Sequence, residues 1–589
     1  MAAVDLWRIL RWEAAGAMDG DVSDYFFVAR GILNGLTPYV DLYESKPPGI
    51  FFLSALSLLV TGDQRFLSVL QWIMLGAIPF LFAAFALHVE RKRHSGVLDQ
   101  TAAGLLGLVV GILFTLFLEE RGGMLQTEGW GSFLGLLYLL SIAWDGAFTT
   151  RRMWISGAFL FGTIFMKEPF LLAALAGALV LCPTWQSFKR SFVIPLLGAG
   201  AAFVIVMVAF GWLGPYLTIH LPAMLWGRIA SDPIDPVWLR WLSIRWLWGN
   251  TTTYNKSAPL FGNLLILFFL SVPLMRRGAG RARDVVVAIA GPASALVFVF
   301  FTYFQLIFWN MRRVGVQSTD ALMTLHDAIF LWWMIAVVVM AICSFLQWKR
   351  GYLRHLVPAV LALCLASQAA GISVYAINHF AFAFPFYVSL AILFLRHMRD
   401  SLWTEGFALA AVLLASIIAF TWNTDPVYMQ QLEGRTQYTY AKNREQTDRL
   451  DALLTACDFD RYYAFGGLNR LQFAKHSHYG PMVNLAFINY LPLNHPLVME
   501  TVRNILLRTP VIVDFEKQQF LSPEIDATIL QSFTDEIPPC AAPHLPIGTA
   551  RVLFRKQRKE LPHPKLLHSA ADAPAIDRSD SPGLPRLLQ

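Results

Sequence analysis

Long apolar runs alternate with short polar or basic breaks along most of the chain. Runs of this kind fold as helices that cross the roughly 30 Å hydrocarbon core of a bilayer. We place membrane spans at 66–89, 102–118, 129–148, 153–166, 170–185, 192–213, 258–275, 285–309, 327–346, 356–377, 382–395 and 403–422. The pattern predicts an α-helical polytopic membrane protein with about 12 to 13 transmembrane helices.

Basic residues follow every second span, and this spacing predicts the topology. The clusters lie at 91–93, 151–152, 189–190, 276–283, 349–354 and 396–399. Because Lys and Arg are concentrated in cytoplasmic loops, we assign these breaks to the cytoplasm and the other loops to the opposite face. The formal charge of +7 is explained by this topology, and we expect no nucleic-acid partner.

The first residues do not fit this topology by themselves. Residues 1–18 are too short and too charged to span a bilayer, and they lack the apolar core of a signal peptide. The segment after them precedes the first span that ends in a basic cluster, so it belongs on the outer face. Either the polar tail crosses the membrane unaided or an initial span is missing, and we favour the missing span.

Beyond residue 422 the pattern changes to that of a domain outside the membrane. The expected elements are a polar amphipathic helix at 437–455, a second helix at 495–508, and strands at 462–467, 510–515 and 549–555. We expect four regions: an N-terminal segment with the first extracytoplasmic loop (1–65), a transmembrane domain (66–422), a small extracytoplasmic α/β domain (423–555) and a disordered tail (556–589).

Two cysteines of the α/β domain are candidates for a disulfide. Cys457 and Cys540 flank most of its predicted core, on the side of the membrane where disulfides persist. A bond between them would close a long loop and stabilise the domain. The alternative is two unrelated thiols, because the sequence does not give the distance between their Cα atoms.

The first outer loop carries the most specific motif. It runs through MDGDVSDYFFVARGILNGLTPYV and DLYESKPPGIFF, whose acids, lysine and paired prolines do not suit lipid. The order of these residues resembles the first extracytoplasmic loop of bacterial relatives of protein O-mannosyltransferases. With the aminoarabinose transferases, these belong to the C superfamily of glycosyltransferases (GT-C), which use polyprenyl-phosphate sugars. The matching residues are Asp21, Tyr25, Ala29, Gly35, Pro38, Tyr39, Asp41, Lys46, Pro47, Pro48 and Gly49.

The resemblance implies that Asp21 is the catalytic base. Glycosyl transfer needs a carboxylate that takes a proton from the acceptor hydroxyl and cations that hold the leaving phosphate, and Asp21 and Lys46 supply one of each. Alternatively, Asp21 caps a helix that begins near Asp24, and Lys46 extends to lipid headgroups. The family's Asp-Glu pair is Asp21-Val22 here, and Ser45 replaces the glutamate before the lysine of aminoarabinose transferases. We therefore expect no metal and no cofactor.

Further polar residues on the outer face complete the candidate site. Guanidinium forks suit phosphate, so we expect Arg312 or Arg313 to reach the donor phosphate together with Lys46. The other candidates are Asp41, Glu128, Lys167 and His379. The alternatives are a solvated turn for the glutamate, an ion pair of the lysine with the next residue, and a structural hydrogen bond for the histidine.

These features predict an integral membrane glycosyltransferase in a bacterial cytoplasmic membrane. We expect it to move a sugar from a polyprenyl-phosphate donor to an extracytoplasmic glycan, lipid or protein, with inversion at the anomeric carbon. A transporter or flippase of lipid-linked glycans is an alternative, which predicts charges buried within spans. A polymerase of such glycans is another, and it predicts chemistry in a large central loop.

Overall fold

The computed structural model describes three stretches of the chain. They are 20–224, 384–397 and 442–556, without 43, 45, 122–124, 145–148, 183, 466–467, 472, 480–501, 504, 516–526, 528 and 530. Within these stretches the chain is mostly helical and also forms a small sheet. The spans predicted between 258 and 377 and at 403–422 lie outside the described residues.

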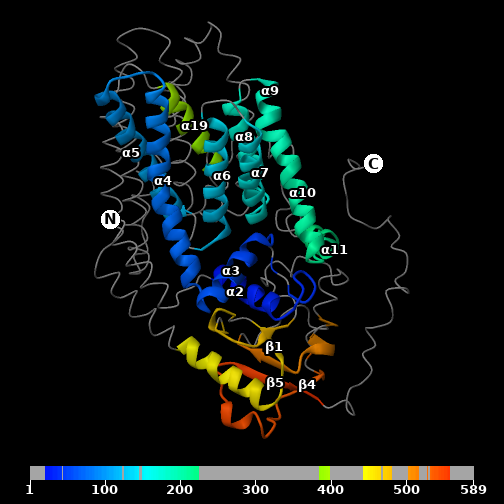
Figure 1. The fold of residues 1–589 in the computed structure, drawn as a ribbon. Helices are drawn as coiled ribbons and strands as arrows, with labels where there is room; N and C mark the ends of the chain where they lie inside the picture. Colours follow the sequence, from blue (N-terminus) through cyan, green and yellow to red (C-terminus); the bar gives the residue numbers. More distant parts are fainter. Residues whose placement is uncertain are drawn as a thin grey trace, which may run out of the picture.

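Apolar helices pack side by side into a bundle (Figure 1). Its members are α4 (Arg65–Arg91), α5 (Val97–Arg121), α6 (Thr127–Ala143), α7 (Thr150–Met166), α8 (Phe170–Leu181), α9 (Trp185–Phe188), η1 (Lys189–Val193), α10 (Ile194–Ala209) and α19 (Phe384–His397). They overlap the first six predicted spans and the span at 382–395. Of the described helices, Arg65–Arg91 and Trp185–Ala209 are long and apolar enough to cross a membrane, judged by length and composition.

Basic side chains bind carbonyl groups at one end of the bundle. Arg93 donates to the carbonyl of Arg396, which in turn donates to the carbonyl of Ala143. Arg152 donates to the carbonyl of Trp144, the residue that follows α6. Such carbonyls at helix C-termini lack partners within the helix, and the helix dipole favours cations beside them. Three of the basic clusters therefore gather at the same end of the bundle.

Two shorter helices lie at the opposite end, between the bundle and the sheet (Figure 1). They are α2 (Gly20–Leu33), which contains part of the first-loop motif, and α3 (Gly49–Thr61), which follows its paired prolines. The sequence pattern does not predict α3. Its 13 residues rise only about 20 Å, too little to cross a bilayer. One face of α3, with Ile50 and Phe51, packs against neighbouring helices, whereas Leu56, Leu59 and Val60 of its second half are exposed.

A mixed sheet lies on the far side of α2. Its strands are β1 (Arg461–Phe465), β2 (Ser477–His478), β3 (Val511–Asp514), β4 (Phe533–Thr534) and β5 (Arg551–Arg555), in the order β2-β1-β3-β5-β4. β1 is parallel to β2 and β3, and β5 is antiparallel to β3 and β4. The strands β1, β3 and β5 fall where the sequence predicts them, and a helix at 442–456 matches the one expected at 437–455.

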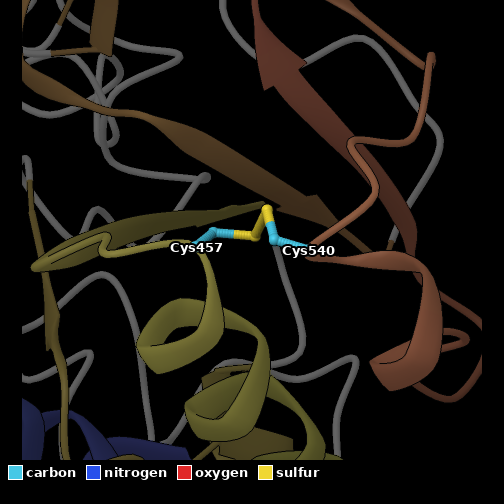
Figure 2. Close-up of a disulfide and its surroundings, with 2 residues drawn as sticks. All are labelled: Cys457 and Cys540. Carbon is cyan, nitrogen blue, oxygen red and sulfur yellow. A yellow bond between two sulfur atoms is a disulfide. The ribbon is translucent and has the colours of Figure 1, made fainter.

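A disulfide joins Cys457 and Cys540, which are 83 residues apart in the chain (Figure 2). Their Cα atoms lie 5.3 Å apart, within the usual range for such a bond. Cys457 directly follows the helix at 442–456, and Cys540 lies in the turn before η5 (Ala542–His544). Of the two alternatives that the sequence leaves open, the structure contains the bond.

We expect loss of this disulfide to destabilise the sheet domain by about 2 to 4 kcal/mol, because the unfolded chain regains the freedom of a long loop. Cys457→Ser with Cys540→Ser in the full chain should lower the temperature at which β3 and β5 lose hydrogen-exchange protection. Cys182→Ser is the control, since Cys182 is free. Complete alkylation of Cys457 and Cys540 in unreduced protein would contradict the bond.

Candidate functional site

A buried ion pair lies at the end of the bundle opposite the arginines. The Nζ atom of Lys167 is 2.5 Å from Oε1 of Glu128, and the two side chains are only 9% and 4% exposed. Thr127 donates its hydroxyl to Oε2 of Glu128 at 2.7 Å. Burial of a lone charge costs several kcal/mol, so each ion needs the other. The structure thus joins two of the candidates from the sequence.

Helix ends explain why this pair forms here. Glu128 lies in the first turn of α6, where the helix dipole favours a negative charge. Lys167 follows the last residue of α7, where the dipole favours a positive charge. Because α6 and α7 are consecutive and pack antiparallel, the start of one helix meets the end of the other. The two dipoles and the ion pair therefore reinforce one another.

A second lysine pairs with a second glutamate close by. The Nζ atom of Lys46 lies 3.2 Å from Oε1 of Glu44, and the side chains are 12% and 6% exposed. The same ammonium group lies 5.7 Å from the centre of the Tyr25 ring, within range of a cation–π interaction. Its positive charge also favours the ionised form of the Glu128 carboxylate, after that of Lys167. We call Glu44, Lys46, Glu128 and Lys167 the Lys–Glu cluster.

The KPPG motif brings Lys46 to this cluster. Its two prolines restrict the backbone directly before α3, and the second is the N-cap of that helix. A Cβ atom on Gly49 would lie 2.4 Å from the backbone oxygen of Phe165 in α7. Only glycine therefore allows α3 to approach the last turn of α7, two residues before Lys167. This backbone contact brings the segment that follows Lys46 against the end of α7 that precedes Lys167.

An aromatic group connects the loops that carry the two lysines. The hydroxyl of Tyr216, in η2 (Tyr216–His220), donates to Oε1 of Glu168 at 2.6 Å. The ring of His220 packs on Tyr39, with the ring centres 4.7 Å apart. The hydroxyl of Tyr39 donates to the backbone carbonyl of Lys46 at 3.0 Å. The loop at 167–169 is thereby linked to the segment of Lys46.

Asp41 contacts the sheet domain. Its Oδ2 atom accepts the backbone N–H of Thr37 at 2.9 Å. Its Oδ1 atom accepts the hydroxyl of Tyr479 at 3.2 Å and lies 3.6 Å from Nη1 of Arg508. Both oxygens are thus engaged in structural contacts, which indicate an anchoring role for this carboxylate.

Other candidates are only partly within the described structure. Asp21 is the second residue of α2, so the helix includes it and starts earlier than the expected position near Asp24. The side chain of Asp21 lies outside what the structure describes, as do all of Arg312, Arg313 and His379.

Several residues of the site escape the sequence analysis. Glu44 has a usable signal, since it stands two residues before the motif lysine. Tyr39 matches the family motif, but nothing in its position predicts the bond to the carbonyl of Lys46. Tyr216 and His220 fall in the predicted outer loop at 214–257, and their link to Glu168 depends on how separate helices pack.

The arrangement is suited to holding an anion. Two ammonium groups lie mostly shielded from solvent, each paired with a carboxylate, and phosphate oxygens are acceptors of the same kind as these carboxylates. Among the described residues, no group of three or more His, Cys, Asp or Glu side chains could hold a metal ion. Comparisons with models of protein families, with curated proteins and with solved structures give no match for this chain.

Proposed function

We propose that this chain is an integral membrane glycosyltransferase of the GT-C superfamily. It takes a sugar from a polyprenyl phosphate and gives it to a glycan, lipid or protein outside the cytoplasm. The observation that carries the proposal is the Lys–Glu cluster. It combines a buried lysine, Lys167, and a half-buried one, Lys46, at one end of an apolar bundle with the motif whose resemblance suggests this chemistry.

The position of the cluster favours this proposal over a flippase. Its ion pairs lie at helix ends, beside the first outer loop, whereas a transport pathway requires ionisable groups within the spans. The arginine clusters gather at the far end, as a cytoplasmic face would require. The proposal includes about 12 to 13 spans and a sheet domain outside the cytoplasm.

The proposed reaction is a single displacement. Asp21 takes the proton of the acceptor hydroxyl as its oxygen forms a bond to the anomeric carbon. The bond from that carbon to the phosphate oxygen breaks, and the polyprenyl phosphate leaves with the electron pair. Lys46, Lys167 and Arg312 or Arg313 stabilise its charge. The acceptor attacks opposite the leaving group, so the configuration inverts.

The direct test uses the purified chain in liposomes with polyprenyl-phosphate sugars. We expect cleavage of the sugar–phosphate bond and release of polyprenyl phosphate, followed by mass spectrometry. In cells, deletion should remove one sugar from a surface glycan while its lipid-linked donor accumulates. Movement of an intact lipid-linked glycan between leaflets without this cleavage would establish the flippase instead.

Lys46→Ala tests the contact with phosphate. Loss of one charged hydrogen-bond donor should lower kcat/KM for the donor about 10- to 100-fold. The Michaelis constant for the acceptor should change little, because the proposed contact is to the leaving phosphate. The control is Lys189→Ala, which removes an exposed lysine of η1. An effect confined to the acceptor would contradict the assignment.

A further inference from the structure

The sheet domain holds the first outer loop at three points. Phe27 of α2 is buried in the domain's core, beside residues of the helix at 442–456 and of β1. The Nδ2 atom of Asn34 donates to Oγ of Ser477 in β2 at 2.7 Å. The third point is the carboxylate of Asp41, which binds Tyr479 and Arg508. These contacts combine apolar burial with hydrogen bonds, so the loop and the domain form one packed unit.

The carboxylate of Asp41 bonds both to its own turn and to the sheet domain. Through Oδ2 it closes the turn at 37–41, whose backbone N–H at residue 41 also donates to the carbonyl of Thr37 at 2.9 Å. Through Oδ1 it reaches the domain, where Arg508 also donates to the hydroxyl of Tyr479. Movement of the domain would therefore act directly on the turn.

The turn at 37–41 is connected to Lys46 through Tyr39. This residue has a φ of 68°, in the left-handed region that residues other than glycine seldom occupy. Its side chain is buried, and its hydroxyl donates to the carbonyl of Lys46 at 3.0 Å. Such a conformation persists only where the surroundings hold it. Tyr39 is held by its own N–H, which donates to the carbonyl of Leu42 at 2.5 Å. The bonds of Asp41 within the turn and to the domain hold the turn around it.

We propose that Asp41 is a positioning residue through which the disulfide-bonded sheet domain sets the position of Lys46. The sequence of contacts runs from Arg508 and Tyr479 to Asp41, and from the turn through Tyr39 to Lys46. The inference rests on the proposed function only for the role of Lys46 toward phosphate. The mechanical connection itself is independent of the reaction.

The test compares two arginines of the sheet domain by hydrogen exchange in the full chain: Arg508, which pairs with Asp41 of the loop, and Arg551, which pairs within the domain. Arg508→Ala with Tyr479→Phe removes the domain's bonds to Asp41, while Arg551→Ala removes a pair with Asp535 at 3.7 Å. The two arginines are matched in exposure, at 43% and 48%. We expect exchange at 37–48 to quicken about five- to tenfold in the first variant only, with β3 and β5 still protected.

Activity provides the second measurement. Arg508→Ala with Tyr479→Phe should raise the Michaelis constant for the polyprenyl-phosphate donor by a similar factor. Tyr479→Phe alone should raise it by a smaller factor. Unchanged exchange at 37–48, or the same change with Arg551→Ala, would overturn the inference whether or not transfer is detected. Faster exchange in a chain without any transferase activity would support the anchor and overturn the proposed function.

Discussion

Lys167→Met is expected to destabilise the folded chain by about 3 to 5 kcal/mol, because it leaves the buried carboxylate of Glu128 without its partner. Lys46 does not replace it, since its ammonium group already pairs with Glu44. The double variant Lys167→Met with Glu128→Gln should recover most of this stability, because neither side chain then carries a charge. Thermal unfolding of the purified chain in lipid nanodiscs measures both effects.

Transfer activity separates the structural role of this pair from its functional one. The double variant should fold normally yet transfer sugar poorly, because it lacks one of the cations that stabilise the leaving phosphate. The control is Arg65→Met, which breaks an exposed pair with Asp63 and should cost at most about 1 kcal/mol. A double variant as unstable as the single one would show that the pair's charges are not the cause.

Asp21→Asn is expected to slow transfer about 100- to 10,000-fold, the usual contribution of a general base. Asparagine has nearly the same shape but cannot take the acceptor's proton, so the chain should still fold and still bind its donor. The measurement is sugar transfer in membranes that contain the polyprenyl-phosphate donor. A rate equal to that of the unmodified chain would exclude Asp21 as the base.

Asp19→Asn provides the matched comparison for this experiment. Asp19 is two residues away and has the same side chain, but it does not match the family motif. Much of the activity should therefore remain in this variant. A greater loss with Asp19→Asn than with Asp21→Asn would move the role of the base to Asp19.

The elements that were predictable are those whose signal is local. The run at 66–89 nearly coincides with α4, because a long apolar helix is recognised from length and composition alone. The strands β1 and β3 are short runs of aromatic or branched residues. β2 and β4 have only two residues each and give no pattern. The helix α3 was missed because its 13 apolar residues are too few to span a membrane, and length was the criterion for the predicted spans.

The candidate site was predictable in its residue types but not in its pairings. Lys46, Glu128 and Lys167 stand out in the sequence because charge near apolar segments is costly. That Lys167 pairs with Glu128, 39 residues away, depends on the packing of two helices, and no spacing rule gives it. For Asp41 the motif suggested a place in the site, whereas its contacts to Tyr479 and Arg508 belong to the domain boundary.

The placement of α2 between the bundle and the sheet domain affects the order of synthesis and folding. Asn34 binds a partner 443 residues later in the chain, and Asp41 binds one 438 residues later. At about 5 to 20 residues per second, a ribosome needs on the order of 20 to 90 s to make that intervening length. During this time Phe27 has no domain to cover it. A chain released early keeps that apolar side chain of α2 exposed, and proteases can recognise the chain as incomplete by this exposed face.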